Sequence, residues 1–353
     1  MSLSPRFHVP ANSSRFFQDY SEAVSQPEGI VHLFWDQVDE IIVNQDYVAE
    51  LIKFDSQYCT AVSSIGTKNI IPTLTYFDKV LQFFDCLPRV IDIGCGQGEF
   101  VYELRKRHIN AIGFDPVLRS NTSFLQSKLW EPSDKPGDLY VMRCVLPHIQ
   151  NPWKFLNQIF ISAPRAKVLI EFQRIEWILE QQIWYQVSHD HVNLFSLNDF
   201  NVKYKVFDSG TFSNGEWGWV LIGSQESSMP EVERAIPKNY RASFTELFLK
   251  KDLFLSNLSK IDHPIAIWGA AGKGIVLAHA AVQKIEKLLA IDADSNRWNC
   301  FLENSGVKVL APNALGRLDR ETLILVCNPN HYFQVKQFIG DSFEVTIPNE
   351  VLK

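Results

Sequence analysis

The stretch RVIDIGCGQG, residues 89–98, decides the fold. Residues 89–93 are apolar and rich in β-branched side chains, which predicts a short strand. Three glycines in residues 94–98 then allow a tight turn and a close approach of the backbone to a ligand. Residues 99–107 predict a helix. The amide N–H groups and positive dipole end at the start of such a helix suit a carboxylate ligand.

The segments that follow predict a parallel sheet. Residues 110–115, 138–145 and 166–171 are apolar runs of strand length, separated by helix-like segments. Alternating strands and helices indicate βαβ units, whose ligands bind at the carboxyl ends of the strands. Asp115 stands at such an end, 21 residues after Gly94, where a carboxylate can accept hydrogen bonds from ribose hydroxyls.

The glycine turn resembles motif I (D/E-x-G-x-G-x-G) of the class I S-adenosylmethionine-dependent methyltransferases. It lacks the G-x-G-x-x-G spacing of dinucleotide-binding turns, although a nicotinamide enzyme or a purely structural turn remain the alternatives. The resemblance implies S-adenosylmethionine as the cofactor, with Leu129 and Trp130 near its adenine. The expected cofactor-binding residues are Asp92, Gly94, Gly96, Gly98, Asp115, Leu129, Trp130, Cys144 and Val145.

A second motif, YQVSHDHVNLFS at residues 185–196, carries candidate acid–base groups. In an extended segment His189 and His191 share one face, with Asp190 on the other. Histidine titrates near neutral pH and can take a proton from an acidic carbon or a hydroxyl. The pair could equally be a surface loop, a hydrogen-bonded core pair or two metal ligands, although the sequence offers no obvious third ligand.

This second motif resembles the Tyr-His-Glu-His-x-x-x-Phe-Ser signature of the nucleotide-sugar C-methyltransferases. Residues 146–152 and 265–274, and the strand ending at Asp292, resemble further segments of that family in the same order, from about residue 40 onward. The resemblance implies that a base removes a proton beside a keto group and that the enolate attacks the sulfonium methyl. His191 would be that base, and the expected catalytic residues are His191, His189 and Asp190, with no metal.

The chain departs from that family in three places. Ser188 replaces the signature tyrosine, the family's His-Gly-Gly-Ser segment has only residues 213–217 as its nearest counterpart, and the N-terminal zinc module is absent. Tyr58 resembles a tyrosine near the family's substrate site, with ordinary packing as the alternative. The expected substrate-binding residues are Tyr58, Ser188, Gly269, Lys273 and Asp292.

The C-terminal turn also has a chemical interpretation of its own. Residues 269–274, GAAGKG, follow an apolar strand and open a helix-like segment. Glycines and a lysine there suit a phosphate, although the Walker A spacing is absent and the turn could serve packing alone. Residues 328–331, including His331, follow the apolar strand 322–327 and place polar groups at another strand end.

Composition limits the partners and the compartment. The net charge of -6 argues against a dedicated nucleic-acid binder, and no apolar run has the length of a signal peptide or a membrane span. The six cysteines form no C-x-x-C pair or zinc-finger spacing, as is typical of reduced thiols in the cytosol. We therefore expect a soluble, cytoplasmic protein whose partner is a small molecule, with no nucleic acid or membrane.

The whole chain predicts an α/β protein with three parts. These are an N-terminal lobe (1–75), a class I methyltransferase (Rossmann-like) core (76–227), and a linker helix with a C-terminal Rossmann-like domain (228–353). The expected function is C-methylation of a nucleotide-linked keto-sugar or a related polar metabolite. The alternatives are O- or N-methylation of another small molecule and a non-catalytic cofactor-binding protein.

Overall fold

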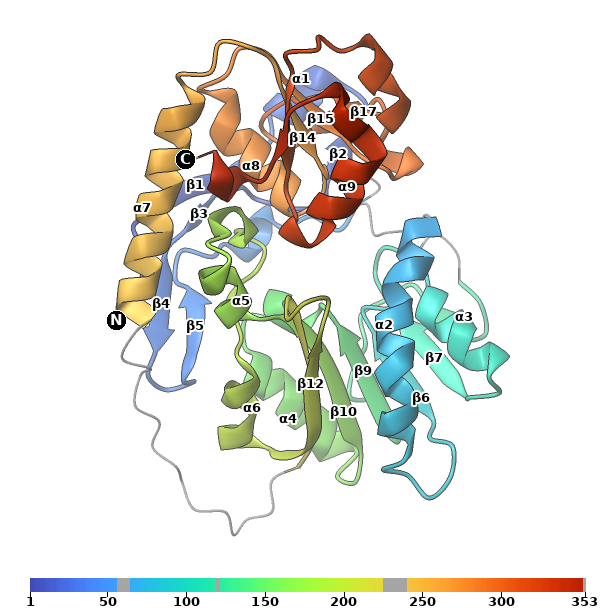
Figure 1. Ribbon diagram of the computed structural model, residues 1–353. Coiled ribbons are helices and arrows are strands. Elements are labelled where there is room, and N and C mark those ends of the chain that lie inside the picture. Colours follow the sequence, from blue (N-terminus) through green and yellow to red (C-terminus); the bar gives the residue numbers. More distant parts are fainter. Residues whose placement is uncertain (56–63, 119–120, 225–239, 352–353) are drawn as a thin grey trace.

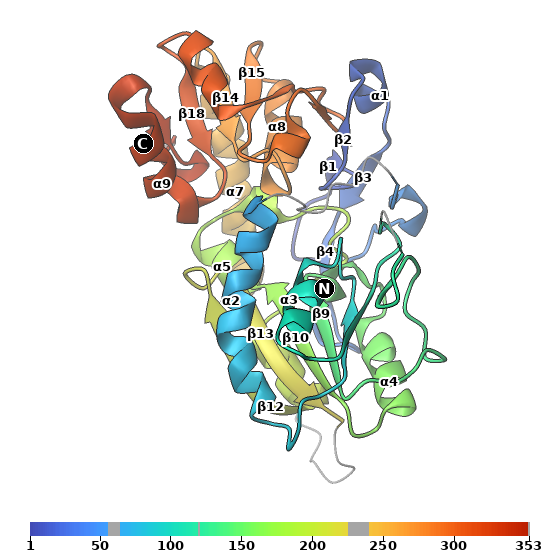
Figure 2. The ribbon, with the colours of Figure 1, turned by 90° about the vertical axis from the view of Figure 1, so that its right-hand side faces the viewer.

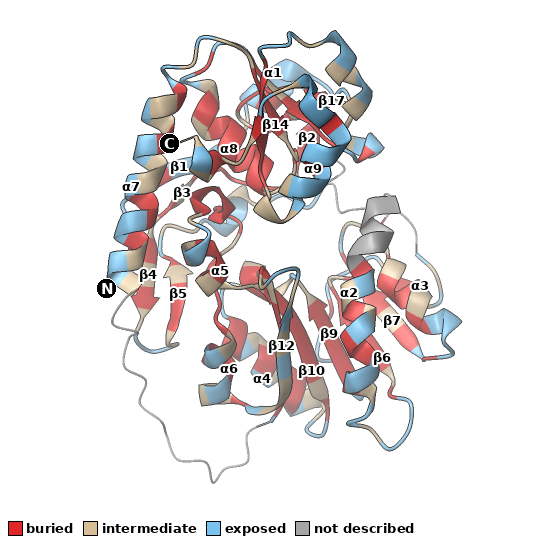
Figure 3. Ribbon diagram, viewed as in Figure 1, coloured by how far each residue is buried: buried red, intermediate tan, exposed pale blue. Residues whose placement is uncertain are grey.

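The computed structural model describes residues 1–55, 64–118, 121–224 and 240–351, without the side chains of residues 64–69. Two α/β units face each other, and strands from the N-terminal segment lie beside both (Figure 1; Figure 2). The central strands of both sheets are buried, whereas the edge strand β12 and the outer helix faces are largely intermediate or exposed (Figure 3). Among the described residues, no helix is both long and apolar enough to cross a bilayer.

The first unit is a seven-stranded sheet of order β12-β13-β10-β9-β6-β7-β8. Strands β6 to β10 run parallel, β13 pairs antiparallel with β10, and β12 pairs antiparallel with β13. The strands are β6 (Val90–Ile93), β7 (Ala111–Phe114), β8 (Leu125–Gln126), β9 (Leu139–Arg143), β10 (Lys167–Gln173), β12 (Lys205–Phe212) and β13 (Trp217–Gly223). The predicted strands and the α/β core are therefore confirmed.

Both faces of this sheet are covered because its central strands are apolar on both sides. Along β10, Val168 and Ile170 pack with α4 and α6, whereas Leu169 faces the other way and packs with α2 and α3. The helices of this unit are α2 (Ser64–Leu81), α3 (Glu99–Lys106), α4 (Pro152–Ser162), α5 (Ile175–Glu180) and α6 (Leu197–Lys203). Helix α2 crosses the expected boundary between residues 75 and 76.

The second unit is a five-stranded parallel sheet of order β17-β15-β14-β18-β19. In both units the first strand is central, with the second and third strands on one side and the fourth on the other. The elements are α7 (Tyr240–Leu258), β14 (Ile265–Trp268), α8 (Lys273–Val282), β15 (Leu288–Ile291), β17 (Val309–Leu310), β18 (Leu323–Val326), α9 (Tyr332–Ile339) and β19 (Val345–Thr346).

The N-terminal strands pair with late parts of the chain. Strand β5 pairs with β11 of the first unit, and β2 pairs with β16 of the second. The strands concerned are β1 (Phe7–Pro10), β2 (Phe16–Phe17), β3 (Glu28–Val31), β4 (Leu33–Asp36), β5 (Ile41–Asn44), β11 (Asn193–Leu194) and β16 (Phe301–Leu302). Short elements complete the chain: α1 (Tyr20–Val24), η1 (Ala49–Leu51), η2 (Leu146–His148), η3 (Trp184–Gln186), η4 (Ser295–Arg297), η5 (Pro312–Arg317), η6 (Pro329–His331), η7 (Gly340–Ser342) and η8 (Pro348–Glu350).

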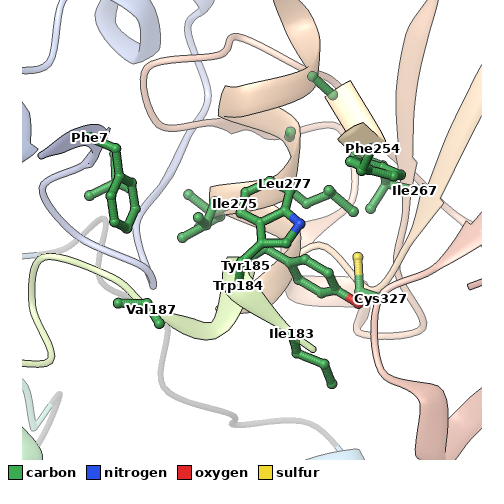
Figure 4. Packing of buried hydrophobic residues seen from close by; sticks show 14 of the residues in the cluster. Phe7, Ile183, Trp184, Tyr185, Val187, Phe254, Ile267, Ile275, Leu277 and Cys327 are labelled. Carbon is green, nitrogen blue, oxygen red and sulfur yellow. The ribbon is translucent and has the colours of Figure 1, made fainter. Parts of the chain in front are cut away.

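One apolar cluster joins the units. Phe7 from the N-terminal segment, Trp184 and Tyr185 from η3, and Phe254 and Ile275 from the second unit all belong to it (Figure 4). Because one buried cluster draws on all three predicted parts, these parts share a core. The domain limits stay a prediction.

Candidate functional site

The glycine turn between β6 and α3 needs its glycines. Gly94, Gly96 and Gly98 have φ angles of 71°, 60° and 88°, a region that favours glycine. A Cβ on Gly94 would lie 2.3 Å from Cγ2 of Val145, and one on Gly98 would lie 2.7 Å from Cδ2 of Leu125. The turn therefore packs closely against the end of β9, where Val145 lies.

Asp92, in β6 just before the turn, is a buried carboxylate that lacks a partner. It is 1% exposed, and neither carboxylate oxygen has a hydrogen-bond partner within the described part of the chain. Burial raises the pKa of Asp92 to about 7, although the Arg143 guanidinium opposes that shift. Because a buried polar group without a partner is costly, the position fits a ligand that brings a donor or a cation.

Asp115, after β7, supports the same turn. Its Oδ2 accepts a hydrogen bond from the Gly96 N–H at 2.8 Å, and its Oδ1 accepts one from the Val117 N–H at 2.9 Å. Burial raises the pKa of Asp115 against the effect of these two bonds. The expected cofactor residues Asp92, Asp115 and Gly96 are thus brought together at one end of the sheet.

The other expected cofactor residues lie in different surroundings. Cys144 directly follows β9, is exposed and has a φ of 58°, which is uncommon for a residue other than glycine. Trp130 is 6% exposed and packs edge-on against Tyr140 and Phe155, whereas Leu129 is 69% exposed. Trp130 is therefore a core residue and Leu129 a surface residue.

His189 is held by the N-terminal segment. Its Nδ1–H donates to the carbonyl of Ile30 at 2.8 Å, and its Nε2 accepts from the Val48 N–H at 3.2 Å. The tautomer follows because a carbonyl only accepts and an N–H only donates. The ring also stacks on Tyr47 and is fully buried. Because both ring nitrogens are hydrogen-bonded, His189 links its own segment to the N-terminal segment.

Asp190 is a buried, ionised carboxylate. Its Oδ2 accepts from the N–H of Ser13 at 3.0 Å and from its Oγ at 2.8 Å, and its Oδ1 accepts from Ser188 Oγ at 2.6 Å. Burial acts to raise the pKa of Asp190, but His191, His148 and these hydrogen bonds lower it below its ordinary value. Ser188, expected to bind substrate, here orients Asp190.

His148 and His191 face each other beside Asp190, with ring centroids 4.7 Å apart. His148 donates from Nδ1–H to the Asp190 carbonyl at 2.7 Å, so in the neutral ring the lone pair is on Nε2. His191 has no hydrogen-bond partner among the described residues. Burial and the neighbouring His148 lower the pKa of His191 to about 4, against the effect of Asp190.

The sequence interpretation did not assign a role to His148. The signal was its place just after the predicted strand 138–145, where ligands of parallel sheets bind. Potential ligand atoms of His148, Asp190 and His191 all lie within 4.8 Å of one another. Such a set can hold a proton or a divalent cation.

The histidine cluster and the glycine turn lie on adjacent strand ends. Strands β6 and β9 pair in parallel, with Ile93 opposite Met142. Val145 contacts the position of Gly94, and His148 lies three residues farther on in η2. The expected cofactor turn and the acid–base groups thus share the carboxyl edge of the sheet.

The groups of the C-terminal turn are engaged within the chain. Lys273 Nζ lies 2.6 Å from Oε1 of Glu216, and the side-chain amides of Asn328 and Asn330 also donate to that carboxylate. Lys273 and Glu216 are 9% and 2% exposed. Residues 213–217 thus contact the second unit, a contribution that the sequence did not indicate.

Asp292 and Gly272 of this turn also make their hydrogen bonds within the chain. Asp292 Oδ2 accepts from the Ala270 N–H at 2.7 Å, and Arg297 lies 3.2 Å from the same oxygen. The N–H of Gly272 donates to the carbonyl of Ser13 at 2.9 Å. A Cβ on Gly269 would have only Cys327 within 4 Å, at 3.8 Å. The remaining expected substrate residue, Tyr58, lies outside the described residues.

One family model matches part of the first unit. A family model described as a methyltransferase domain matches residues 68–203. A search of curated proteins finds no match.

Three solved structures resemble part of this chain at low similarity. A Pyrococcus horikoshii OT3 protein has 16% identity, a TM-score of 0.36 and coverage of 47% of this chain and 94% of its own. The plantazolicin methyltransferase BpumL, in complex with a monoazolic desmethylPZN analog and S-adenosylhomocysteine, has 15% identity, a TM-score of 0.34 and coverage of 46% of this chain and 89% of its own. Magnesium protoporphyrin IX methyltransferase from Synechocystis PCC 6803 has 14% identity, a TM-score of 0.33 and coverage of 47% of this chain and 90% of its own.

Proposed function

We propose that the S-adenosylmethionine-dependent methyltransferase domain of this chain methylates a carbon of a small polar substrate, with a nucleotide-linked keto-sugar as the leading class. One observation carries the proposal. His148, Asp190 and His191 meet at the carboxyl edge of the sheet, beside the glycine turn. A methyl transfer to carbon needs a group that removes a proton, and this cluster supplies it.

The cofactor would be held by the turn from Asp92 to Gly98. When bound, S-adenosylmethionine supplies an electrophilic methyl group on a sulfonium. The partnerless carboxylate of Asp92 suits the cofactor's ammonium group, and the start of α3 suits its carboxylate. Asp115 keeps the turn in place through the bond from Gly96 and would accept hydrogen bonds from the ribose hydroxyls.

His191 is the group to which we assign proton removal. Its imidazole is neutral at pH 7, so a lone pair is available. A keto group acidifies the neighbouring C–H bond. His191 would take that proton as an imidazolium, which leaves a nucleophilic carbon to which the bound cofactor would supply its methyl group. The ionised Asp190 stabilises the imidazolium that results. His189 has no part in proton transfer because both its nitrogens are engaged.

The nucleotide-sugar class follows from the resemblance of residues 185–196 to the nucleotide-sugar C-methyltransferases. The second glycine turn adds no free cation for a phosphate, because Lys273 there is paired with Glu216. Calorimetric titration with S-adenosylhomocysteine and then with dTDP, UDP and GDP tests the two ligands separately. Binding of S-adenosylhomocysteine alone would retain the methyltransferase and point to a substrate without a nucleotide.

Turnover of His191→Ala tests the catalytic assignment. We expect it to fall by about 100-fold or more while the S-adenosylhomocysteine affinity stays unchanged. His331→Ala, at an exposed histidine of the second unit, is the matched control and should leave both quantities unchanged. Unaltered turnover in His191→Ala would refute the assignment. NMR of the product distinguishes a carbon-bound methyl group from one on oxygen or nitrogen, which would favour the O- or N-methyltransferase alternative.

A further inference from the structure

We propose that His148, Asp190 and His191 form a binding site for a divalent cation of the zinc type. The proposal goes beyond methyl transfer and does not depend on the identity of the substrate. It rests on the ligand set, on the groups that orient it and on its position in the fold.

The ligand set is the first observation. Two imidazoles and one carboxylate offer ligand atoms that all lie within 4.8 Å of one another. Zn²⁺ accepts such a set, and three protein ligands leave a further position for water or another small ligand.

The orienting groups are the second observation. Histidine ligands of metals commonly donate their other ring N–H to a carbonyl or carboxylate, which fixes the tautomer. His148 does so through Nδ1–H to the Asp190 carbonyl at 2.7 Å, which leaves Nε2 as its ligand atom. Ser13 and Ser188 hold the Asp190 carboxylate at 2.6–3.0 Å. Hydrogen bonds of this kind support ligating carboxylates in metal sites.

The spacing of the ligand atoms requires a side-chain adjustment. A tetrahedral Zn²⁺ with bonds of about 2.1 Å places its ligand atoms about 3.4 Å apart, so a pair at the 4.8 Å limit would have to close by about 1.4 Å. Rotation of an imidazole ring about its side-chain bonds would bring its nitrogen closer. His191, which has no hydrogen-bond partner among the described residues, is the ring whose rotation breaks no hydrogen bond described here.

A consequence for catalysis follows. The lone pair of His191 that would take a proton from the substrate is also the one that would bind the cation. Both cannot occupy it, so a bound Zn²⁺ would inhibit methyl transfer and a chelator would restore it.

The chain offers a control because two other histidines flank a carboxylate. His8 Nδ1 lies 3.0 Å from Glu28 Oε2, and His279 Nε2 lies 3.5 Å from Glu28 Oε1. Adventitious zinc binding at this second group would be removed by His8→Ala and retained by His148→Ala. His8 is 64% exposed at its side chain, so its replacement should not disturb the fold.

The test is calorimetric titration of the chelator-treated full chain with ZnCl₂ in the absence of substrate. We expect one equivalent to bind, an affinity at least about 100-fold lower in His148→Ala and in His191→Ala, and a loss of about 10-fold in Ser13→Ala, which removes one supporting bond. His8→Ala should bind as the unaltered protein does. Co²⁺ in place of Zn²⁺ reports the same site by its visible absorption.

Retained S-adenosylhomocysteine binding shows that each variant is folded, and His148→Gln replaces His148→Ala if that variant loses it. No zinc binding by the unaltered chain would overturn the site, as would binding that survives His148→Ala and disappears in His8→Ala. Either result leaves the methyltransferase proposal standing, because that is tested by turnover of His191→Ala without added metal.

Discussion

The two glycine turns of this protein occupy the same place in similar sheets, but they differ in whether their polar side chains have partners within the protein. Each follows the central first strand of its unit, and each has an aspartate at the end of the second strand that accepts a bond from the turn, Asp115 from Gly96 and Asp292 from Ala270. Beside the first turn Asp92 has no hydrogen-bond partner in the part of the chain that the structure describes, whereas in the second turn Lys273 is paired with Glu216.

The difference teaches that a glycine turn in this position is not by itself a ligand site. A turn that binds a ligand has polar side chains, such as Asp92, whose hydrogen-bond partners are supplied by the ligand. A turn that fastens two parts of a protein satisfies its groups internally, as Lys273 does through the hairpin of β12 and β13. The four changes below test this contrast, beginning with the largest expected effect.

Lys273→Met should destabilise the protein most. It leaves the buried Glu216 carboxylate without its cation, which typically costs about 3–5 kcal/mol in unfolding free energy. Chemical denaturation measures the loss, and Lys273→Met combined with Glu216→Gln should recover much of it. Loss of nucleotide binding at unchanged stability would instead make the second turn a ligand site and end the contrast.

Gly94→Ala should weaken S-adenosylhomocysteine binding by about 100-fold, because its Cβ meets Val145 and its φ is unfavourable for alanine. Gly272→Ala is the matched change in the second turn, where a Cβ meets nothing within 4 Å. Its cofactor affinity should be unchanged in the same titration. Equal losses in both variants would show that the two turns do not differ in role.

Asp115→Ala should weaken S-adenosylhomocysteine binding by about 10-fold, because it removes the acceptor for the Gly96 N–H and a contact expected to reach the ribose. Asp292→Ala breaks the corresponding bond to Ala270 and should lower thermal stability without changing that affinity. Titration calorimetry and thermal unfolding of both variants separate the two effects. An Asp292→Ala variant with weakened cofactor binding would contradict the assignment.

The pH dependence of the free energy of unfolding should reflect the titration of the Asp92 carboxyl group. Its pKa in the folded chain, about 7, lies above the ordinary 3.8, so the folded form holds a proton that the unfolded form releases. Its contribution is therefore full below about pH 4 and is lost as pH rises through 7. Between pH 6 and 7 we expect the ligand-free protein to lose up to about 1.4 kcal/mol relative to Asp92→Asn. Saturating S-adenosylhomocysteine should remove this difference, whereas an identical pH profile for Asp92→Asn would exclude Asp92 as its source.

The sequence predicted what depends on neighbouring residues. Apolar runs located the strands of both sheets, and the glycine spacing located the first turn, because strand pattern and backbone freedom are local properties. It could not predict that Ser13 holds Asp190 or that Glu216 neutralises Lys273, since those partners are 177 and 57 residues apart. His189 and His191 look alike in sequence, and only the contacts of Ile30 and Val48 distinguish them.

The pairing of the first strands has a consequence for how the chain is made. Strand β5 is synthesised early but can pair with β11 only after that strand has been made. In the same way, Phe16 and Phe17 of β2 can pair only once Leu302 and Phe301 have been made. Contacts between such distant segments are slow to form because a long loop must close first. Strand β2 has no strand partner until the last third of the chain emerges, whereas β5 can pair with β4 at once and lacks only its second neighbour until β11 is made. The late partner of β2 leaves apolar surface exposed in the nascent chain, which favours aggregation.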